Sequence, residues 1–214
     1  MILELIVTGP MQENCYIIAD ESTKSGFVID PGWDADLIKS KLDSLDITEV
    51  TILCTHGHFD HISGVPELRE LTGAKAYMNS EDNFFIQSVS GQTALMCGMG
   101  ADEFEFDGEI NDGDKFTAGE ITLTAMPTPG HSPGGMSLYD GRANVFVGDA
   151  LFAGSVGRVD LPKSSGKVLI HSLTEVLYKL PDDTYVYPGH GPGTTIGHEK
   201  QTNPFTLHPE YLLD

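Results

Sequence analysis

Short apolar runs separated by turn-forming residues open the chain, and this pattern predicts three successive β-strands. The predicted strands cover residues 3–8, 15–19 and 26–29. Asp34 then stands at a capping position before a helical pattern. Four leucine and isoleucine residues fall on one face of that helix: Leu37, Ile38, Leu42 and Leu45. Residues 50–54 form a continuous apolar run, as expected of a strand covered on both faces.

A second helix is predicted further along, where Pro66 is placed to open it and Gly73 to close it. The second half of the chain repeats this arrangement of strands and helices. Further strands are predicted at 121–126, 136–139, 144–147 and 184–187, with a helix over 165–180 before the last of them. This order fits an α/β fold made of two sheets with helices outside them, a four-layer αββα sandwich. No linker-like segment divides the chain, so residues 1–214 are expected to form one domain.

Composition limits the partners of the protein. The 214 residues include 12 Lys and Arg against 32 Asp and Glu, which gives a net charge of −20. Such a field repels nucleic-acid backbones and anionic lipid, so neither is an expected partner. Most of the excess acid is expected to form a solvated surface.

Cysteine usage and the N-terminus indicate the compartment. No basic region followed by a long apolar run opens the chain, and no stretch approaches the ~20 apolar residues that cross a bilayer. The three cysteines are odd in number and widely spaced, unlike a disulfide framework. Cys15 and Cys54 lie in apolar runs and are expected to be buried. A cytoplasmic protein with reduced thiols is the expectation.

Histidine and aspartate residues follow the predicted strands at the point where each strand ends. One group follows residues 50–54, and three later strands each deliver one more residue. The candidates are His56, His58, Asp60, His61, His131, Asp149 and His190. Carboxyl ends of strands in open sheets commonly carry sites. Glycine precedes His131, Asp149 and His190 and permits a close backbone approach to a shared centre.

Five histidines and two aspartates are too many ligands for one tetrahedral ion, and they suit zinc, iron or manganese. They divide into His56, His58 and His131 for a first metal and Asp60, His61 and His190 for a second, with Asp149 bridging both. Two divalent ions ~3.5–4 Å apart can share a hydroxide that attacks a carbonyl. Asp60 and Asp149 are the predicted catalytic carboxylates, and zinc is placed before iron and manganese.

Four motifs in this order are similar to those of a known family. They are Thr-His-Gly-His-Phe-Asp-His at 55–61, Pro-Gly-His-Ser-Pro-Gly at 129–134, Gly-Asp at 148–149 and Pro-Gly-His-Gly at 188–191. The chain thereby resembles the metallo-β-lactamase superfamily, in particular short bacterial members of its glyoxalase II (hydroxyacylglutathione hydrolase) branch. The resemblance implies an αββα fold, two metals that are often zinc, and hydrolysis of a small-molecule thioester such as S-lactoylglutathione.

The resemblance also places Arg158 where a basic residue contacts glutathione, although Arg158 could instead only pair with Asp160. Long glyoxalase II enzymes add a C-terminal helical domain with further basic residues, and no such domain is expected here. No Lys or Arg occurs between Lys75 and Lys115, a span that includes the expected active-site flap at 84–109. Apolar residues at 84–86 and 95–99 are expected to pack in the core or flap, or to form a roof over the metals.

Other readings of the same residues remain open. A mononuclear iron persulfide dioxygenase would use only His56, His131 and Asp149. A hydrolase of another ester or lactone class is compatible with the same centre. An antibiotic-degrading β-lactamase is disfavoured by Asp149, where many such enzymes carry a cysteine ligand. A nuclease is disfavoured by the charge, and a non-catalytic binding protein by the intact ligand set.

Three residues flank the ligands and are expected to orient imidazoles: Asp30, Thr55 and Thr128.

Overall fold

Two six-stranded sheets form the centre of the protein in the computed structural model, which describes residues 1–86 and 104–212. The first sheet has its strands in chain order: β1 (Ile2–Thr8), β2 (Glu13–Asp20), β3 (Ser25–Ile29), β4 (Glu49–Leu53), β5 (Lys75–Met78) and β6 (Gly108–Glu109). The second sheet has the order β14 (Thr194–Thr195), β13 (Tyr185–Pro188), β10 (Asn144–Gly148), β9 (Met136–Tyr139), β8 (Ile121–Pro127) and β7 (Lys115–Ala118). β11 (Leu151–Phe152) and β12 (Ser155–Val156) form a separate hairpin.

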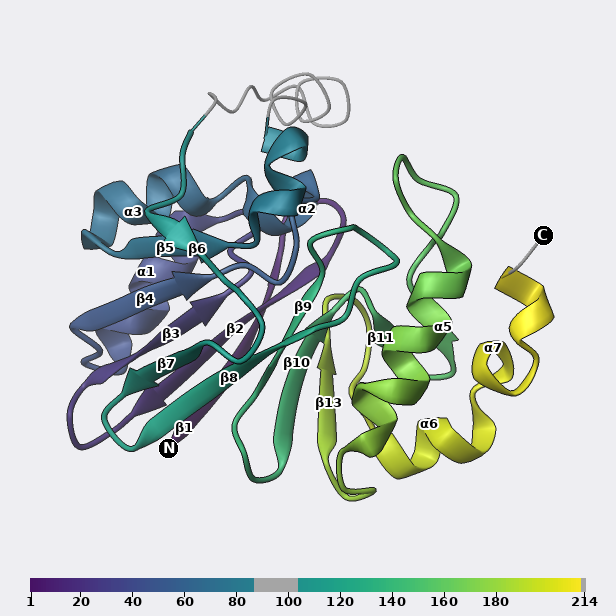
Figure 1. The fold of residues 1–214 in the computed structure, drawn as a ribbon. Coiled ribbons are helices and arrows are strands. Elements are labelled where there is room, and N and C mark those ends of the chain that lie inside the picture. The colour runs from purple at the N-terminus through teal and green to yellow at the C-terminus, as the bar shows by residue number, and fades with distance from the viewer. Residues whose placement is uncertain (87–103, 213–214) are drawn as a thin grey trace.

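Helices cover the outer faces of the two sheets (Figure 1). On the first sheet lie α1 (Ala35–Ser44) and α3 (Val65–Thr72), and on the second lie α5 (Gly166–Glu175) and α6 (Ile196–Thr202). The short helix α7 (Pro204–Leu207) packs against α5 and α6. Three buried apolar clusters fill the spaces between these four layers. The predicted αββα sandwich is therefore confirmed.

Strand β2 shows why the apolar pattern produces these layers. All eight of its residues are buried, and alternate side chains face opposite sides of the sheet. Cys15 and Ile17 join the cluster beneath α1 and α3, whereas Tyr16 and Ile18 join the cluster between the two sheets. A strand covered on both faces reads as a continuous apolar run in the sequence.

Two details of the predicted helices are wrong. Leu37 is 52% exposed, and the buried residues of α1 are Ala35, Ile38 and Leu42. Asp34 precedes α1, but its side chain makes no capping bond there and accepts a hydrogen bond from Gly9 N at 2.8 Å.

The helix predicted over 165–180 is also shorter than expected. α5 ends at Glu175, and a 3₁₀ turn, η2 (Leu177–Lys179), follows it. Pro181 disfavours helical backbone at Leu180, which is extended with ψ of 156° and ends this tighter turn.

Cys15 and Cys54 are buried and unpaired, as predicted. Burial raises the pKa of both thiols well above the ordinary value, so they stay protonated and poorly nucleophilic near neutral pH. We expect iodoacetamide at pH 8 to leave both unmodified in the native protein and to alkylate both after denaturation. Peptide mass spectrometry measures this, and modification of either thiol in the folded protein would contradict the prediction. Cys97 lies outside the described residues.

None of the helices in residues 1–86 and 104–212 is both long enough and apolar enough to span a membrane.

Candidate metal centre

All seven predicted ligands meet between the ends of the two sheets. The chain leaves β4 and passes His56 and His58 before the short helix α2 (Phe59–Ile62), which carries Asp60 and His61. The second sheet supplies the remaining three residues after β8, β10 and β13: His131, Asp149 and His190. Residues far apart in the sequence thus reach one centre because their strands end at the same place.

The side chains form two groups of three with Asp149 between them. The donor atoms of His56, His58 and His131 lie within 4.8 Å of one another, and so do those of Asp60, His61 and His190. His58 Nδ1 is 2.9 Å from His131 Nε2 in the first group. His190 Nε2 is 3.2 Å from Asp60 Oδ2 in the second.

Asp149 faces both groups with different oxygens. Its Oδ1 lies 3.4 Å from His61 Nε2, and its Oδ2 lies 3.6 Å from His131 Nε2 and 3.8 Å from His190 Nε2. The neighbouring imidazoles, His61 first, hold the pKa of this buried carboxyl well below its usual range against the effect of burial. The carboxylate is therefore ionised and placed to bridge two cations.

The donor set fits divalent metal ions. Within the described part of the chain, His56 Nε2, His61 Nε2 and Asp149 Oδ1 are buried and make no hydrogen bond. Buried polar atoms in native proteins are nearly always paired, since leaving one unsatisfied costs about 1–3 kcal/mol. Imidazole nitrogens and carboxylate oxygens that converge in this way are the ligands of zinc, iron and manganese.

Burial also keeps His58 available as a ligand. Desolvation and the neighbouring His131 lower the pKa of His58 to about 3, so its ring stays neutral above that pH and keeps a free lone pair. Metal binding requires the neutral form of imidazole.

Asp30 anchors histidines from both groups. Its Oδ2 accepts a hydrogen bond from Thr55 Oγ1 at 2.6 Å and lies 3.0 Å from His61 Nδ1, while its Oδ1 accepts from Thr55 N at 2.6 Å. Thr55 Oγ1 is in turn 3.0 Å from His56 Nδ1. Asp30 and Thr55 therefore orient imidazoles as the sequence predicts. Because both oxygens of Asp30 take part in these hydrogen bonds, its role is to support the ligands.

We expect Asp30→Asn to weaken metal binding at both positions, because one carboxylate supports His61 directly and His56 through Thr55. Loss of such a supporting partner typically costs about 10–100-fold in metal affinity. Chelator competition on the purified variant measures the effect. Unchanged affinity at both positions would contradict this role.

Thr128 does not orient a ligand, contrary to expectation. Its hydroxyl lies 2.8 Å from Ser137 Oγ. His131 Nδ1 instead donates to the backbone carbonyl of Arg158 at 2.9 Å. A backbone partner so distant along the chain leaves no signal in the sequence.

Glu13 also lies beside the candidate ligands, and the sequence pattern did not single it out. It begins β2, is fully buried, and accepts a hydrogen bond from Thr8 Oγ1 at 2.7 Å. Its other oxygen lies 3.8 Å from His61 Nδ1, behind the second ligand group. Burial raises the pKa of this carboxyl well above its ordinary value. The one available signal was an acidic residue beside an apolar strand.

The candidate metal centre opens into a pocket of about 570 Å³. Besides five ligands its walls are mostly apolar, formed by Met11, Phe59, Phe84, Phe85, Phe152, Leu161 and Pro162. The Phe85 ring lies 4.4 Å from the ring of His58, so residues 84 and 85 form part of the expected apolar roof. The segment 95–99, and much of the flap expected at 84–109, lie outside the described residues.

Arg158 lines this pocket and also pairs with Asp160. Its contact with a substrate stays a prediction. Its Nε and Nη2 donate to the two carboxylate oxygens at 2.9 Å each. The two side chains are 70% and 69% exposed, which makes the pair weak and exchangeable.

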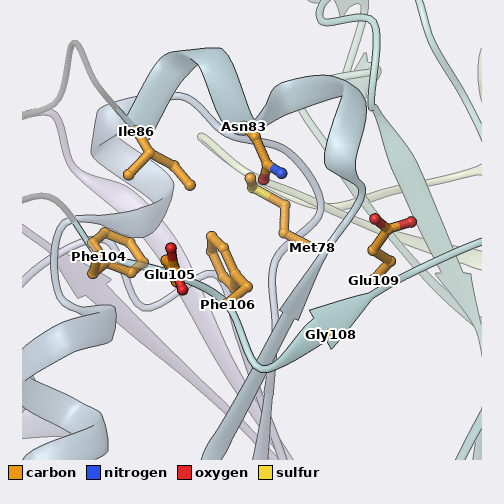
Figure 2. A pocket seen from close by; sticks show the side chains of 8 residues that line it. All are labelled: Met78, Asn83, Ile86, Phe104, Glu105, Phe106, Gly108 and Glu109. Atoms are coloured by element: carbon orange, nitrogen blue, oxygen red, sulfur yellow. The ribbon is translucent and has the colours of Figure 1, made fainter.

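A second pocket, of about 650 Å³, lies on the other side of the helical residues that follow β5 (Figure 2). Asn83 and Ile86 line it together with Phe104 and Phe106. Among the lining residues that the structure describes, Glu105 and Glu109 are the acidic ones, and they form no metal-binding group with the others. None of the candidate ligands lines this pocket.

Comparison with known proteins agrees with this geometry. The family model of the metallo-β-lactamase superfamily matches residues 8–190, and the chain belongs to this superfamily. Hydroxyacylglutathione hydrolase GloC of Haemophilus influenzae is 34% identical over 208 residues, which covers 96% of this chain and 98% of the relative.

Three solved structures have a similar fold. The B3 metallo-β-lactamase BLEG-1 has a TM-score of 0.88 and 33% identity, covering 96% of this chain and 99% of that one. TTHA1623 in a di-iron-bound form has a TM-score of 0.84 and 36% identity, with 94% and 99% covered. ETHE1 from Myxococcus xanthus has a TM-score of 0.83 and 30% identity, with 99% and 88% covered.

Proposed function

We propose that the protein hydrolyses a small thioester, such as S-lactoylglutathione, at a centre of two divalent metals, with zinc as the first choice. The observation that carries this proposal is the pair of three-residue ligand groups joined by Asp149 at the base of an apolar pocket. The name of the relative GloC supports the substrate class. The di-iron form of TTHA1623 supports two metals and makes iron the main competitor of zinc.

In this proposal His56, His58 and His131 hold one metal, and Asp60, His61 and His190 hold the other. Asp149 bridges them. When bound, two such ions would supply a hydroxide near neutral pH and would polarise the carbonyl of the substrate. Asp60 Oδ2 and Asp149 Oδ2 both lie near His190 Nε2, at 3.2 and 3.8 Å, and in this proposal Asp60 serves beside Asp149 as a catalytic carboxylate.

The apolar walls of the pocket suit a small substrate. Phe59, Phe84 and Phe152 line the space next to the ligands. Apolar walls lower the local dielectric and so strengthen the attraction between cations and a developing oxyanion. With a net charge of −20, the protein is not expected to bind nucleic acid or anionic membranes.

We expect Arg158→Ala to raise KM for S-lactoylglutathione about fivefold to tenfold and to leave kcat nearly unchanged, since an exposed charge contributes roughly 1 kcal/mol. Asp160→Asn is the matched variant. It releases the guanidinium from its bidentate partner, so KM should fall or stay constant. Steady-state kinetics measure both, and an unchanged KM in Arg158→Ala would restrict this arginine to its pairing with Asp160.

Metal analysis together with an S-lactoylglutathione assay tests the proposed function. Two metals per chain with thioester hydrolysis support it. Two metals without thioester hydrolysis keep the centre and discard this substrate. One iron per chain, with sulfite formed from a persulfide and oxygen, would establish the dioxygenase alternative that uses His56, His131 and Asp149 alone.

β-Lactam hydrolysis is a second candidate because BLEG-1 covers nearly the whole chain. A chromogenic cephalosporin assayed in parallel with the thioester separates the two activities. The higher kcat/KM identifies the preferred substrate class.

A further inference from the structure

A buried carboxylate outside the ligand set joins two of the ligand-bearing loops. Asp82 ends the 3₁₀ turn η1 (Ser80–Asp82), which follows β5, and it is fully buried. Its Oδ2 accepts hydrogen bonds from Gly57 N at 2.9 Å and Ser132 Oγ at 2.7 Å. Its Oδ1 accepts one from Gly134 N at 2.7 Å.

Two of these partners directly adjoin the ligands of the first group. Gly57 lies between His56 and His58, and Ser132 follows His131. The first two histidines follow a strand of one sheet and His131 follows a strand of the other. Asp82 makes no hydrogen bond, among the residues described, to the loops that carry Asp149 and His190.

Both glycines approach Asp82 too closely to carry a side chain. A Cβ atom on Gly57 would lie 2.8 Å from the Asp82 carbonyl oxygen, and one on Gly134 would lie 2.8 Å from Asp82 Cγ. Contacts this short leave no space for any other residue type unless the backbone or the Asp82 side chain moves. The two loops are therefore packed against Asp82 as well as bonded to it.

We propose that Asp82 is a positioning residue that sets the separation of His56 and His58 from His131, and thereby tunes the first metal position selectively. The inference rests on the ligand assignment in the proposed function and is independent of the substrate. Three donors stabilise the buried carboxylate, because charge-assisted hydrogen bonds offset part of its desolvation. An amide at this position has one acceptor oxygen and cannot serve all three.

Asp20 provides a matched control at the far end of β2. It accepts hydrogen bonds from Ser22 N at 2.8 Å, Ser22 Oγ at 2.7 Å and Glu120 N at 2.7 Å, so its donors are also two backbone amides and one hydroxyl. Asp20 likewise connects the first sheet to the second, through the turn between β7 and β8. Glu13, at the opposite end of the same strand, is the residue beside the candidate ligands.

The test compares Asp82→Asn and Asp20→Asn with the unchanged protein, all loaded with zinc. Protein labelled with ¹⁵N in its histidine rings is titrated with a zinc chelator, and the ring signals report which ligands release metal. In Asp82→Asn we expect His56, His58 and His131 to release zinc at a chelator strength roughly tenfold lower, as for loss of a supporting partner. His61 and His190 should change by less than threefold.

Asp20→Asn should lower the unfolding temperature without separating the two groups of histidines. Equal weakening of both groups in Asp82→Asn, unchanged zinc retention, or the same pattern in Asp20→Asn would overturn the proposal. If Asp82→Asn does not fold, Ser132→Ala removes one of the three bonds and should weaken the same group by a smaller factor. Unaltered zinc retention in Ser132→Ala would then count against it. None of these outcomes depends on thioester hydrolysis.

Discussion

Replacing Asp149 with alanine is expected to abolish the bridge between the two ligand groups and to lower kcat on the order of 10³-fold. The carboxylate faces His61, His131 and His190 within 3.4–3.8 Å, so its loss leaves both metal positions with one ligand fewer. Metal assistance contributes several kcal/mol to such a reaction, and each 1.36 kcal/mol corresponds to a factor of ten in rate.

Metal content and thioesterase kinetics of Asp149→Ala check this expectation. Asp140→Ala is a suitable control, since Asp140 accepts hydrogen bonds from three backbone amides in the turn before β10, away from the ligands. We expect the control to lose stability and to keep its metals. Full activity with both metals retained in Asp149→Ala would refute the bridging assignment.

Replacing Gly189 with alanine is expected to damage the centre without removing any ligand. A Cβ atom there would lie 2.3 Å from Asp149 Oδ1 and 2.6 Å from His61 Cε1. The backbone cannot easily retreat, because Gly189 N donates to Gly148 O at 2.8 Å and Gly189 O accepts from Asn14 N at 2.7 Å. A misplacement of about 1 Å at an active site can cost 10²-fold in rate, and we expect a loss of this order.

Gly191→Ala is the control that distinguishes the effect of crowding by a Cβ atom from the effect of backbone conformation. Gly191 has a φ of 71°, yet a Cβ atom on it would meet nothing within 4 Å. Its replacement should cost about 1 kcal/mol of stability through backbone strain and leave metal binding intact. Thermal unfolding and metal analysis of both variants give the comparison. Normal metal content in Gly189→Ala would show that the centre tolerates the added methyl group.

Strand positions and the meeting of the ligands were predictable because both follow local rules. The apolar run at 50–54 corresponds to β4, and the residues at 136–139 form β9 as expected. Glycines before ligands also behave as expected, with φ of 132° at Gly130 and 51° at Gly148. Since strands that end at one edge bring their following residues together, the sequence order of the ligands was sufficient to locate the centre.

Contacts between distant segments could not be predicted in the same way. Asp34 bonds Gly9 in place of its own helix, and His131 selects the carbonyl of Arg158 in place of Thr128. Leu37 fits the spacing of α1 but lies on its exposed side, because the width of a helix's buried face depends on what packs against it. These features depend on three-dimensional neighbours that spacing along the chain does not encode.

Ligands drawn from both sheets would make the bound metals internal cross-links. On the proposed assignment, one metal joins His56 to His131 and the other joins His61 to His190, so long chain segments are closed into loops. Separating the two sheets would then require coordinate bonds to break before the apolar layer between them is exposed. The metal-loaded protein should accordingly unfold slowly, with a lifetime set by metal release, and its resistance to proteolysis should track the exchange rate of the ions.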